Sequence, residues 1–210
     1  MFRPTTFGKY VLLKRIAIGG MAEVFRAKAF GAEGFEKVAA VKRMLPHLSS
    51  DAQFVDMFIN EAKLAAGLNH ANIVQIYDFG CINNLLFLCM EYIRGKDISE
   101  ITGRLKEREL AAPPELACHL FIEVLNGLHH AHNQRDRFGK PMHLIHRDVS
   151  PPNIIVSYDG EVKIADFGIA KATRTKVQTS SGVLKGKYSY MSPEQATGQP
   201  LDHRTDIFSA

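Results

Sequence analysis

The stretch LIHRDVSPPNIIVSYDGEVKIADFGIA, residues 144–170, decides how the rest of the chain is interpreted. Its apolar runs are short, IIV at 154–156 and VKIA at 162–165, and polar residues separate them. This pattern predicts short strands joined by loops. Upstream, Leu116, Leu120, Val124 and Leu128 recur at four-residue steps behind Pro113–Pro114. That spacing predicts a helix at roughly 114–133.

The N-terminal part has a different pattern. Residues 10–43 contain three strand-like runs, and Gly19–Gly20 separate the first two, which predicts a hairpin. Residues 50–67 have helical periodicity, with Ser50 and Gln53 fitting a capping box. Another apolar strand is expected at 85–91. The first part is therefore expected to be rich in strands, and the second to combine helices with short strands.

One charge interrupts the apolar side of the 50–67 helix. Phe54, Phe58, Glu61 and Ala65 fall on one face, so Glu61 lies in the apolar stripe. Either the charge is tolerated at the edge of the stripe, or it is a partly buried carboxylate that needs a cationic partner.

Composition excludes several classes of protein. The chain has 210 residues, is 46% hydrophobic and carries a formal net charge of +4, which gives no argument for nucleic acid or an anionic membrane as a partner. No apolar run reaches transmembrane length, and a signal peptide is not expected. The three cysteines lack metal-site spacing and are interpreted as reduced thiols in a cytoplasmic protein.

Six short motifs follow one another in a telling order. They are the glycine turn at 16–24, Lys42 in AAVKRM, Glu61, HRDVSPPN at 146–153, DFG at 166–168 and MSPE at 191–194. Each is weak alone, but the ordered set resembles the serine/threonine protein kinases of bacterial type. The resemblance extends from Tyr10 to the end of the chain and implies a two-lobed α+β kinase fold. The N-terminal lobe is expected at 1–93 and an incomplete C-terminal lobe at 94–210.

The resemblance implies ATP and Mg²⁺ as cofactors, with Mn²⁺ as the alternative, and a serine or threonine hydroxyl of a protein as acceptor. Lys42 is expected to contact the α- and β-phosphates and Glu61 to hold Lys42. Asn153 and Asp166 supply the oxygen ligands that Mg²⁺ requires. Asp148 is expected to accept or orient the substrate hydroxyl. His146 is expected to bond backbone near DFG, and Asp206 to bond the backbone of the HRD loop.

The nucleotide base has its own expected contacts. Adenine is expected between the lobes, with the backbone of Glu91 and Ile93 on its edge and Asp97 near the ribose. The apolar and loop residues expected around the nucleotide are Ile16, Ala17, Gly19, Gly20, Val24, Ala40, Met90 and Ile155. Under the alternative interpretation the apolar members of this set are ordinary core. The remaining histidines, such as His129, His130 and His132, are interpreted as surface or core fillers.

Several positions depart from the family pattern. Ala17 and Ala22 replace two glycines of the loop, which predicts weakened but retained nucleotide binding. Ser150 stands where serine/threonine members carry lysine, and Lys187 stands where they carry threonine. We hypothesise that Lys187 replaces the missing charge, against the alternative of a solvated loop lysine.

The activation segment, 166–194, offers hydroxyls for autophosphorylation, with Arg147 as the expected phosphate partner. These hydroxyls belong to Thr173, Thr175, Thr179, Ser180 and Ser181. A catalytically silent pseudokinase acting as a scaffold remains the alternative from another class. A small-molecule kinase is a third interpretation, which MSPE weakens.

Overall fold

The computed structural model describes residues 3–167 and 188–210. The chain divides into two compact units, the first of Met1–Gly67 and Gln75–Tyr92, the second of Leu68–Val74 and Ile93–Ala210. Residues 68–74, which the predicted N-terminal lobe includes, therefore group with the second unit. Each unit combines a sheet with one or more helices, which confirms the α+β class.

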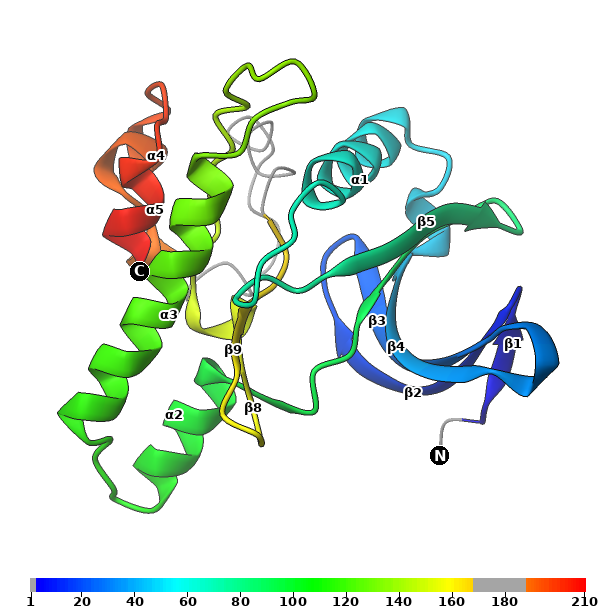
Figure 1. Cartoon of the computed structure of the whole chain (residues 1–210), viewed down its shortest axis with the longest axis horizontal. Coiled ribbons are helices and arrows are strands. Elements are labelled where there is room, and N and C mark those ends of the chain that lie inside the picture. Colours follow the sequence, from blue (N-terminus) through cyan, green and yellow to red (C-terminus); the bar gives the residue numbers. More distant parts are fainter. Residues whose placement is uncertain (1–2, 168–187) are drawn as a thin grey trace. The chain divides into compact units, whose positions relative to one another are not determined.

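The first unit is built on a six-stranded antiparallel sheet with the strand order β1-β2-β3-β4-β6-β5 (Figure 1). Its strands are β1 (Thr5–Phe7), β2 (Tyr10–Ile18), β3 (Ala22–Phe30), β4 (Glu36–Met44), β5 (Ile76–Ile82) and β6 (Leu85–Glu91). Single 3₁₀ turns follow β3 at Ala32–Gly34 and β4 at Pro46–Leu48. The hairpin at Gly19–Gly20 is confirmed, whereas β5 and the short β1 were not predicted.

Helix α1 (Ala52–Ala65) lies against this sheet, but its start differs from the prediction. Asp51, not Ser50, is the N-cap, and its carboxylate accepts a hydrogen bond of 2.9 Å from the amide of Gln53. The predicted capping box at Ser50 is therefore wrong by one residue. A carboxylate at this position satisfies an amide that the first turn leaves without a partner.

The sheet of the first unit separates two apolar clusters. On the α1 side, Phe58 and Ala62 of the helix pack with Ala22, Met44 and Leu88 of the strands. On the other face, residues from the N-terminal strands form the larger cluster, whose members are Phe7, Tyr10, Leu12, Phe25, Ala27, Ala39, Val41, Phe87 and Cys89. Successive strand residues point to opposite faces, so β3, β4 and β6 each contribute to both clusters.

The second unit combines two helices with a three-stranded sheet of order β7-β8-β9. These elements are β7 (Gly95–Asp97), α2 (Ile98–Glu107), α3 (Pro114–His132), β8 (Ile154–Ser157) and β9 (Val162–Ile164). Residues 68–74 belong here because the amide of Val74 donates to Ile164 O and the amide of Ile164 donates to Asn72 O. The Asn72 side chain adds hydrogen bonds to Val162 O and to Glu123.

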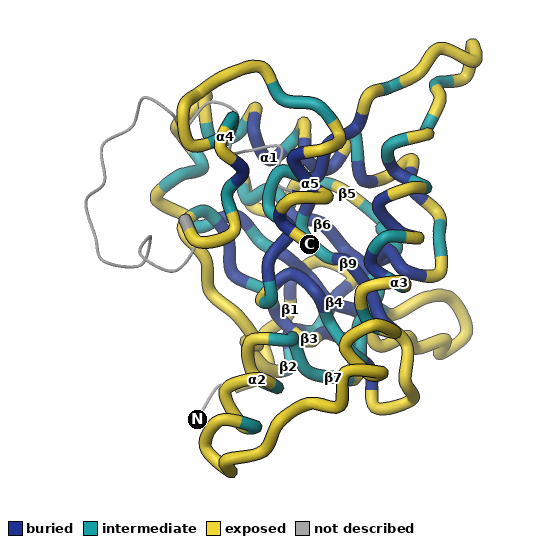
Figure 2. The backbone as a smooth tube through the Cα atoms, turned by 90° about the vertical axis from the view of Figure 1, so that its left-hand side faces the viewer, coloured by how far each residue is buried: buried dark blue, intermediate teal, exposed yellow. Residues whose placement is uncertain are grey.

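Helix α3 confirms the predicted element, while its apolar stripe is only half buried. Val124 and Leu128 are buried, but Leu116 is 47% exposed. Figure 2 shows the contrast with the sheets, where β9 is dark blue throughout. Periodicity identifies the stripe without saying which part of it another element covers.

The remaining elements of the second unit are short. They are the 3₁₀ turns Pro151–Asn153 and Tyr188–Tyr190 and the helices α4 (Pro193–Thr197) and α5 (Arg204–Ser209). Ser192 caps α4 in a complete capping box with Gln195. Among the described residues, every helix is too short or too polar to cross a membrane.

Candidate active site

Lys42 and Glu61 form a buried ion pair in the first unit. Lys42 lies on β4 and Glu61 on α1, and Nζ of the lysine lies 2.5 Å from Oε1 of the glutamate. Their side chains are only 9% and 8% exposed. The buried interpretation of Glu61 is therefore confirmed, together with its cationic partner. Desolvated charges are tolerated in such a place only when they are paired.

Four of the expected nucleotide residues share one face of this sheet. Val24 on β3 is paired directly with Lys42 on β4, and Ala40 is paired with Met90 on β6. Directly opposed residues project to the same side, and so do residues two apart on a strand. Val24, Ala40, Lys42 and Met90 therefore lie on a common surface. Ile16, on β2, is exposed.

The glycine turn is close to β-hairpin geometry. The amide of Gly19 donates to Ala22 O at 2.8 Å, and Ala17, Gly19, Gly20 and Ala22 all have φ outside the left-handed region. Alanine is strained only where φ is positive. The two alanines therefore cost no backbone strain in this loop.

The expected contacts of the adenine edge and ribose are partly used within the protein. The amide of Glu91 donates to Gln75 O at 2.8 Å, so this amide is already used within the protein. Asp97 caps α2, and its Oδ1 accepts from the amide of Glu100 at 2.8 Å. Ile155 is paired with Asp97 in the sheet of the second unit. The ribose contact of Asp97 and the base contact of Ile93 stay predictions.

Asp148 and Asn153 are joined in the second unit. The Asn153 side-chain amide donates from Nδ2 to the Asp148 carbonyl at 2.8 Å and to the Asp148 carboxylate Oδ2 at 3.0 Å. Asn153 is 8% exposed, and its backbone accepts from the amide of Ala165 at 2.8 Å. Both side-chain bonds use the NH₂ group and neither uses the amide oxygen. That oxygen has the chemistry of a hydrogen-bond acceptor or a metal ligand.

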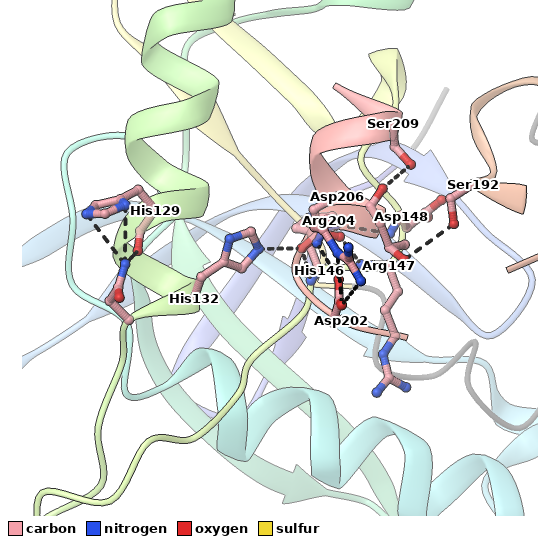
Figure 3. Close-up of polar contacts among 12 residues, drawn as sticks. His129, His132, His146, Arg147, Asp148, Ser192, Asp202, Arg204, Asp206 and Ser209 are labelled. Atoms are coloured by element: carbon pink, nitrogen blue, oxygen red, sulfur yellow. Dashed lines mark hydrogen bonds and ion pairs between the residues drawn. The ribbon is translucent and has the colours of Figure 1, made fainter. Parts of the chain in front are cut away.

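Asp206, at the start of α5, organises the backbone of the HRD loop (Figure 3). Its carboxylate is fully buried and accepts from the amides of His146 and Arg147 at 2.7 and 2.8 Å, which confirms the prediction. His132 Nε2 lies 2.7 Å from Oδ2 of the same carboxylate, the oxygen that also accepts from the amide of His146. The interpretation of His132 as a filler is therefore wrong. A carboxylate accepts only, so His132 is the donor.

His146 links the loop that carries Asp148 to the loop that carries Asp166. Its Nδ1 accepts from the amide of Asp148 at 3.2 Å, so its protonated Nε2 donates to Ala165 O at 3.1 Å. The ring lies 4.6 Å from that of Phe167. Burial lowers the pKa of His146, which outweighs the opposing effect of Asp206. The imidazole is thus neutral, buried and fully bonded, as expected for a structural histidine.

Two residues of these loops adopt left-handed backbone conformations. Arg147 has φ 65° and Asp166 has φ 55°. Non-glycine residues in this region cost of order 1–3 kcal/mol and are found mostly where the surroundings impose them. The backbone amides that donate to Asp206 constrain the loop that carries Asp148. The bond from His146 to Ala165 O constrains the loop that carries Asp166.

The departures from the family pattern have mixed outcomes. Ser150 is 3% exposed and its hydroxyl lies 3.3 Å from Asp148 O, so it supports the loop rather than facing solvent. Glu194 accepts a bond of 2.6 Å from the hydroxyl of Thr205. Lys187 and the hydroxyls expected to be phosphorylated lie outside the described residues; these are Thr173, Thr175, Thr179, Ser180 and Ser181.

The donor set of the second unit suits a small hard cation. Among residues 3–167 and 188–210, no three His, Cys, Asp or Glu side chains gather as a closed metal cage. Mg²⁺ is usually held by one or two protein oxygens plus phosphates and water, and it does not need such a cage. The amide oxygen of Asn153 and the carboxylate of Asp166 fit this requirement.

A model of one family, described as the protein kinase domain, matches residues 10–210. The chain belongs to this family. Tyrosine-protein kinase MasK of Myxococcus xanthus is 47% identical over 203 residues, which are 97% of this chain and 31% of MasK. Serine/threonine-protein kinase PknL of Mycobacterium tuberculosis is 37% identical over 96% of this chain and 47% of PknL. The crystal structure of the M. tuberculosis PknI kinase domain has a TM-score of 0.69 at 27% identity, covering the whole chain and 73% of that domain.

These matches confirm the protein-kinase fold and the bacterial type of the family. Kinases of this family use ATP with a divalent cation and act on proteins. The chain spans about a third to a half of the length of the curated relatives named here.

Proposed function

We propose that this kinase domain transfers the γ-phosphoryl group of ATP to a serine or threonine hydroxyl of a protein. The observation that carries the proposal is the Asp148–Asn153 pair, held in place by the buried His146 and Asp206. Positioning and charge neutralisation are what phosphoryl transfer chiefly requires of a protein. Serine/threonine kinases at 37% identity support the choice of acceptor.

Each side chain has a definite role in this proposal. Lys42, oriented by Glu61, binds the α- and β-phosphates. Asp148 accepts the proton of the substrate hydroxyl. The hydroxyl oxygen forms a bond to the γ-phosphorus of ATP, the bond from that phosphorus to the β,γ-bridging oxygen breaks, and ADP leaves. Asn153 and Asp166 hold Mg²⁺, which neutralises charge on the phosphates when it is bound. Mn²⁺ satisfies the same oxygen ligands and is the second candidate.

Two observations favour a tyrosine hydroxyl as the alternative acceptor. MasK, at 47% identity, is named a tyrosine kinase, and Ser150 replaces the lysine of serine/threonine members. Radiolabelled ATP, a mixed protein substrate and phosphoamino acid analysis separate the two. Phosphoserine or phosphothreonine supports the proposal, and phosphotyrosine alone assigns the chain to the alternative. Nucleotide binding without any label transfer contradicts both and favours a scaffold.

The same labelled protein tests the remaining proposals. Mass spectrometry of the activation segment checks autophosphorylation, with Asp148→Asn as the control. Transfer with Mg²⁺ and with Mn²⁺ identifies the preferred cation. A cytoplasmic location is proposed because Cys81, Cys89 and Cys118 are all free thiols.

A further inference from the structure

A second ionic cluster lies beside the Lys42 position, on the opposite face of the sheet. Glu23 on β3 is paired directly with Arg43 on β4, one step along from the pair of Val24 and Lys42. Because side chains alternate along a strand, Glu23 and Arg43 face away from Lys42. Glu23 follows the glycine turn at Gly19–Gly20 closely in the sequence, and Arg43 lies directly opposite it on β4.

Glu23 connects three strands. Its Oε1 lies 2.6 Å from Nη2 of Arg43 on β4, and its Oε2 lies 3.5 Å from Nη1 of Arg15 on β2. The Glu23 side chain is only 9% exposed, whereas that of Arg15 is 52% exposed. A carboxylate this buried is tolerated because both its oxygens meet a cation.

Arg43 is itself held by aromatic rings. Its guanidinium lies 5.0 Å from the ring centroid of Phe25 and 5.4 Å from that of Phe7, both in the larger core cluster of the first unit. Guanidinium groups are attracted to aromatic faces at such distances. The cluster of Arg15, Glu23 and Arg43 is therefore anchored in the core at one end and open to solvent at the other.

The cluster lies where the backbone pairing of β2 with β3 is irregular. The register shifts between Leu12 and Lys14, and again between Arg15 and Ala17, just before the glycine turn. Each shift removes regular ladder contacts and bends the strand. Ala17 and Ile18 pair with β3 again beyond the second shift, and the side-chain bonds of Glu23 add to this short pairing in fixing where the turn lies.

We propose that Glu23 and Arg43 are positioning residues that hold the glycine turn at the height at which its backbone amides reach the phosphates of ATP. They act through β2 and β3 and do not touch the nucleotide. This inference rests on the proposed function, since it requires the turn to bind phosphates.

The test compares the dissociation constant for MgATP, measured by calorimetry, with kcat and thermal stability. Glu23→Gln and Arg43→Gln are each expected to weaken MgATP binding about fivefold to tenfold, with kcat within about twofold. The double variant should lose less than the product of the two single losses, because the residues act as one unit. Arg15→Gln, at an exposed position, should weaken binding about twofold to threefold without endangering the fold.

Two control variants separate positioning from general stability. Glu36→Gln breaks the 2.6 Å pair of Lys28 and Glu36 at the far end of the same strand pair. Tyr10→Phe removes the buried hydroxyl that donates to Asp78 at 2.7 Å, away from the turn. Both should leave the dissociation constant unchanged, even where the melting temperature falls.

Unchanged MgATP affinity in Glu23→Gln, Arg43→Gln and Arg15→Gln overturns the inference, whatever happens to their stability. The same holds if Tyr10→Phe weakens binding as much as they do. If the unaltered domain itself binds no MgATP, the proposed function fails first. That result differs from one in which the domain binds MgATP and the substitutions at Glu23 leave the dissociation constant unchanged.

Discussion

The two units bury charge in different ways. In the first unit, Lys42 and Glu61 meet as long side chains from a strand and a helix. In the second unit, the carboxylate of Asp206 receives two backbone amides and one imidazole. A side-chain pair can separate by torsion alone, whereas backbone donors move only if the loop itself moves.

Because of this difference, we expect the two networks to have different roles. The Asp206 network fixes the backbone that carries Asp148 and imposes the left-handed conformation of Arg147. The Lys42–Glu61 pair fixes the direction of one ammonium group without locking the helix to the strand. We therefore expect the Asp206 network to matter most for stability and the Lys42–Glu61 pair to matter most for holding ATP in the position that transfer requires.

The largest effect is expected from Asp206→Ala. The change leaves buried donors of His132, His146 and Arg147 without their acceptor, at a cost of about 3–5 kcal/mol in the free energy of unfolding. Chemical denaturation measures this loss. Asp202→Asn is the matched control, since its carboxylate bonds exposed Arg204 and little change is expected. Equal stability of the two variants would show that the Asp206 network is not structural.

Glu61→Gln tests the role of the Lys42–Glu61 pair in activity. Without its carboxylate partner, Lys42 loses its fixed direction, and kcat/KM should fall by about 10². The loss of stability should be smaller than for Asp206→Ala. Steady-state kinetics and denaturation on the same samples measure both. Asp56→Asn, an exposed carboxylate on the same helix, should match the unaltered protein. A Glu61→Gln variant with full activity would break the distinction between the units.

Acid should destabilise the protein through the second unit. Burial lowers the pKa of His146, and burial together with neighbouring His130 lowers the pKa of His70. Each then binds fewer protons in the folded than in the unfolded state. Stability is thus full above about pH 6.5 and falls as the pH drops below it, by at most about 1.4 kcal/mol per pH unit for each proton.

Urea denaturation at pH 7.5 and 5.5 checks this expectation. His70→Asn should reduce the difference between the two pH values, whereas His47→Asn, at an exposed histidine, should not. A stability that is independent of pH over this range would contradict this expectation and would mean that the folded protein accommodates His70 and His146 as cations.

The smallest effect is expected at the glycine turn. A Cβ on Gly19 would meet only Ala22 O at 3.5 Å, and φ there lies outside the left-handed region. Gly19→Ala should therefore change MgATP affinity less than about threefold. Gly8→Ala, where φ is +57° and Ile82 lies 2.6 Å from the new carbon, should instead lower the melting temperature. A large loss of affinity in Gly19→Ala would show that the turn changes shape on binding.

The sequence predicted the contacts that a local pattern encodes. Glu61 stood out because a charge interrupted a helical apolar stripe, which left an edge position or a buried carboxylate with a cationic partner as the two interpretations. The family resemblance named Lys42 as that partner. The bonds of His146 and Asp206 followed from the family resemblance. The fold class followed from the same resemblance.

Contacts that depend on distant packing escaped prediction. His132 and Asp206 are 74 residues apart, and nothing in the HHAH run distinguishes the histidine that bonds the carboxylate. The Glu23–Arg43 pair depends on strand register, which periodicity does not define. Ser50 and Asp51 are both good caps, so a one-residue error in the start of α1 could not be avoided.

The central claim is that the two units divide the work, the first holding ATP through Lys42 and the second carrying out transfer through Asp148. Asp148→Asn tests it most directly, with single-turnover label transfer and MgATP calorimetry on the same sample. The account predicts MgATP affinity within about threefold of the unaltered protein and transfer slower by about 10³. Transfer at the unaltered rate would contradict it.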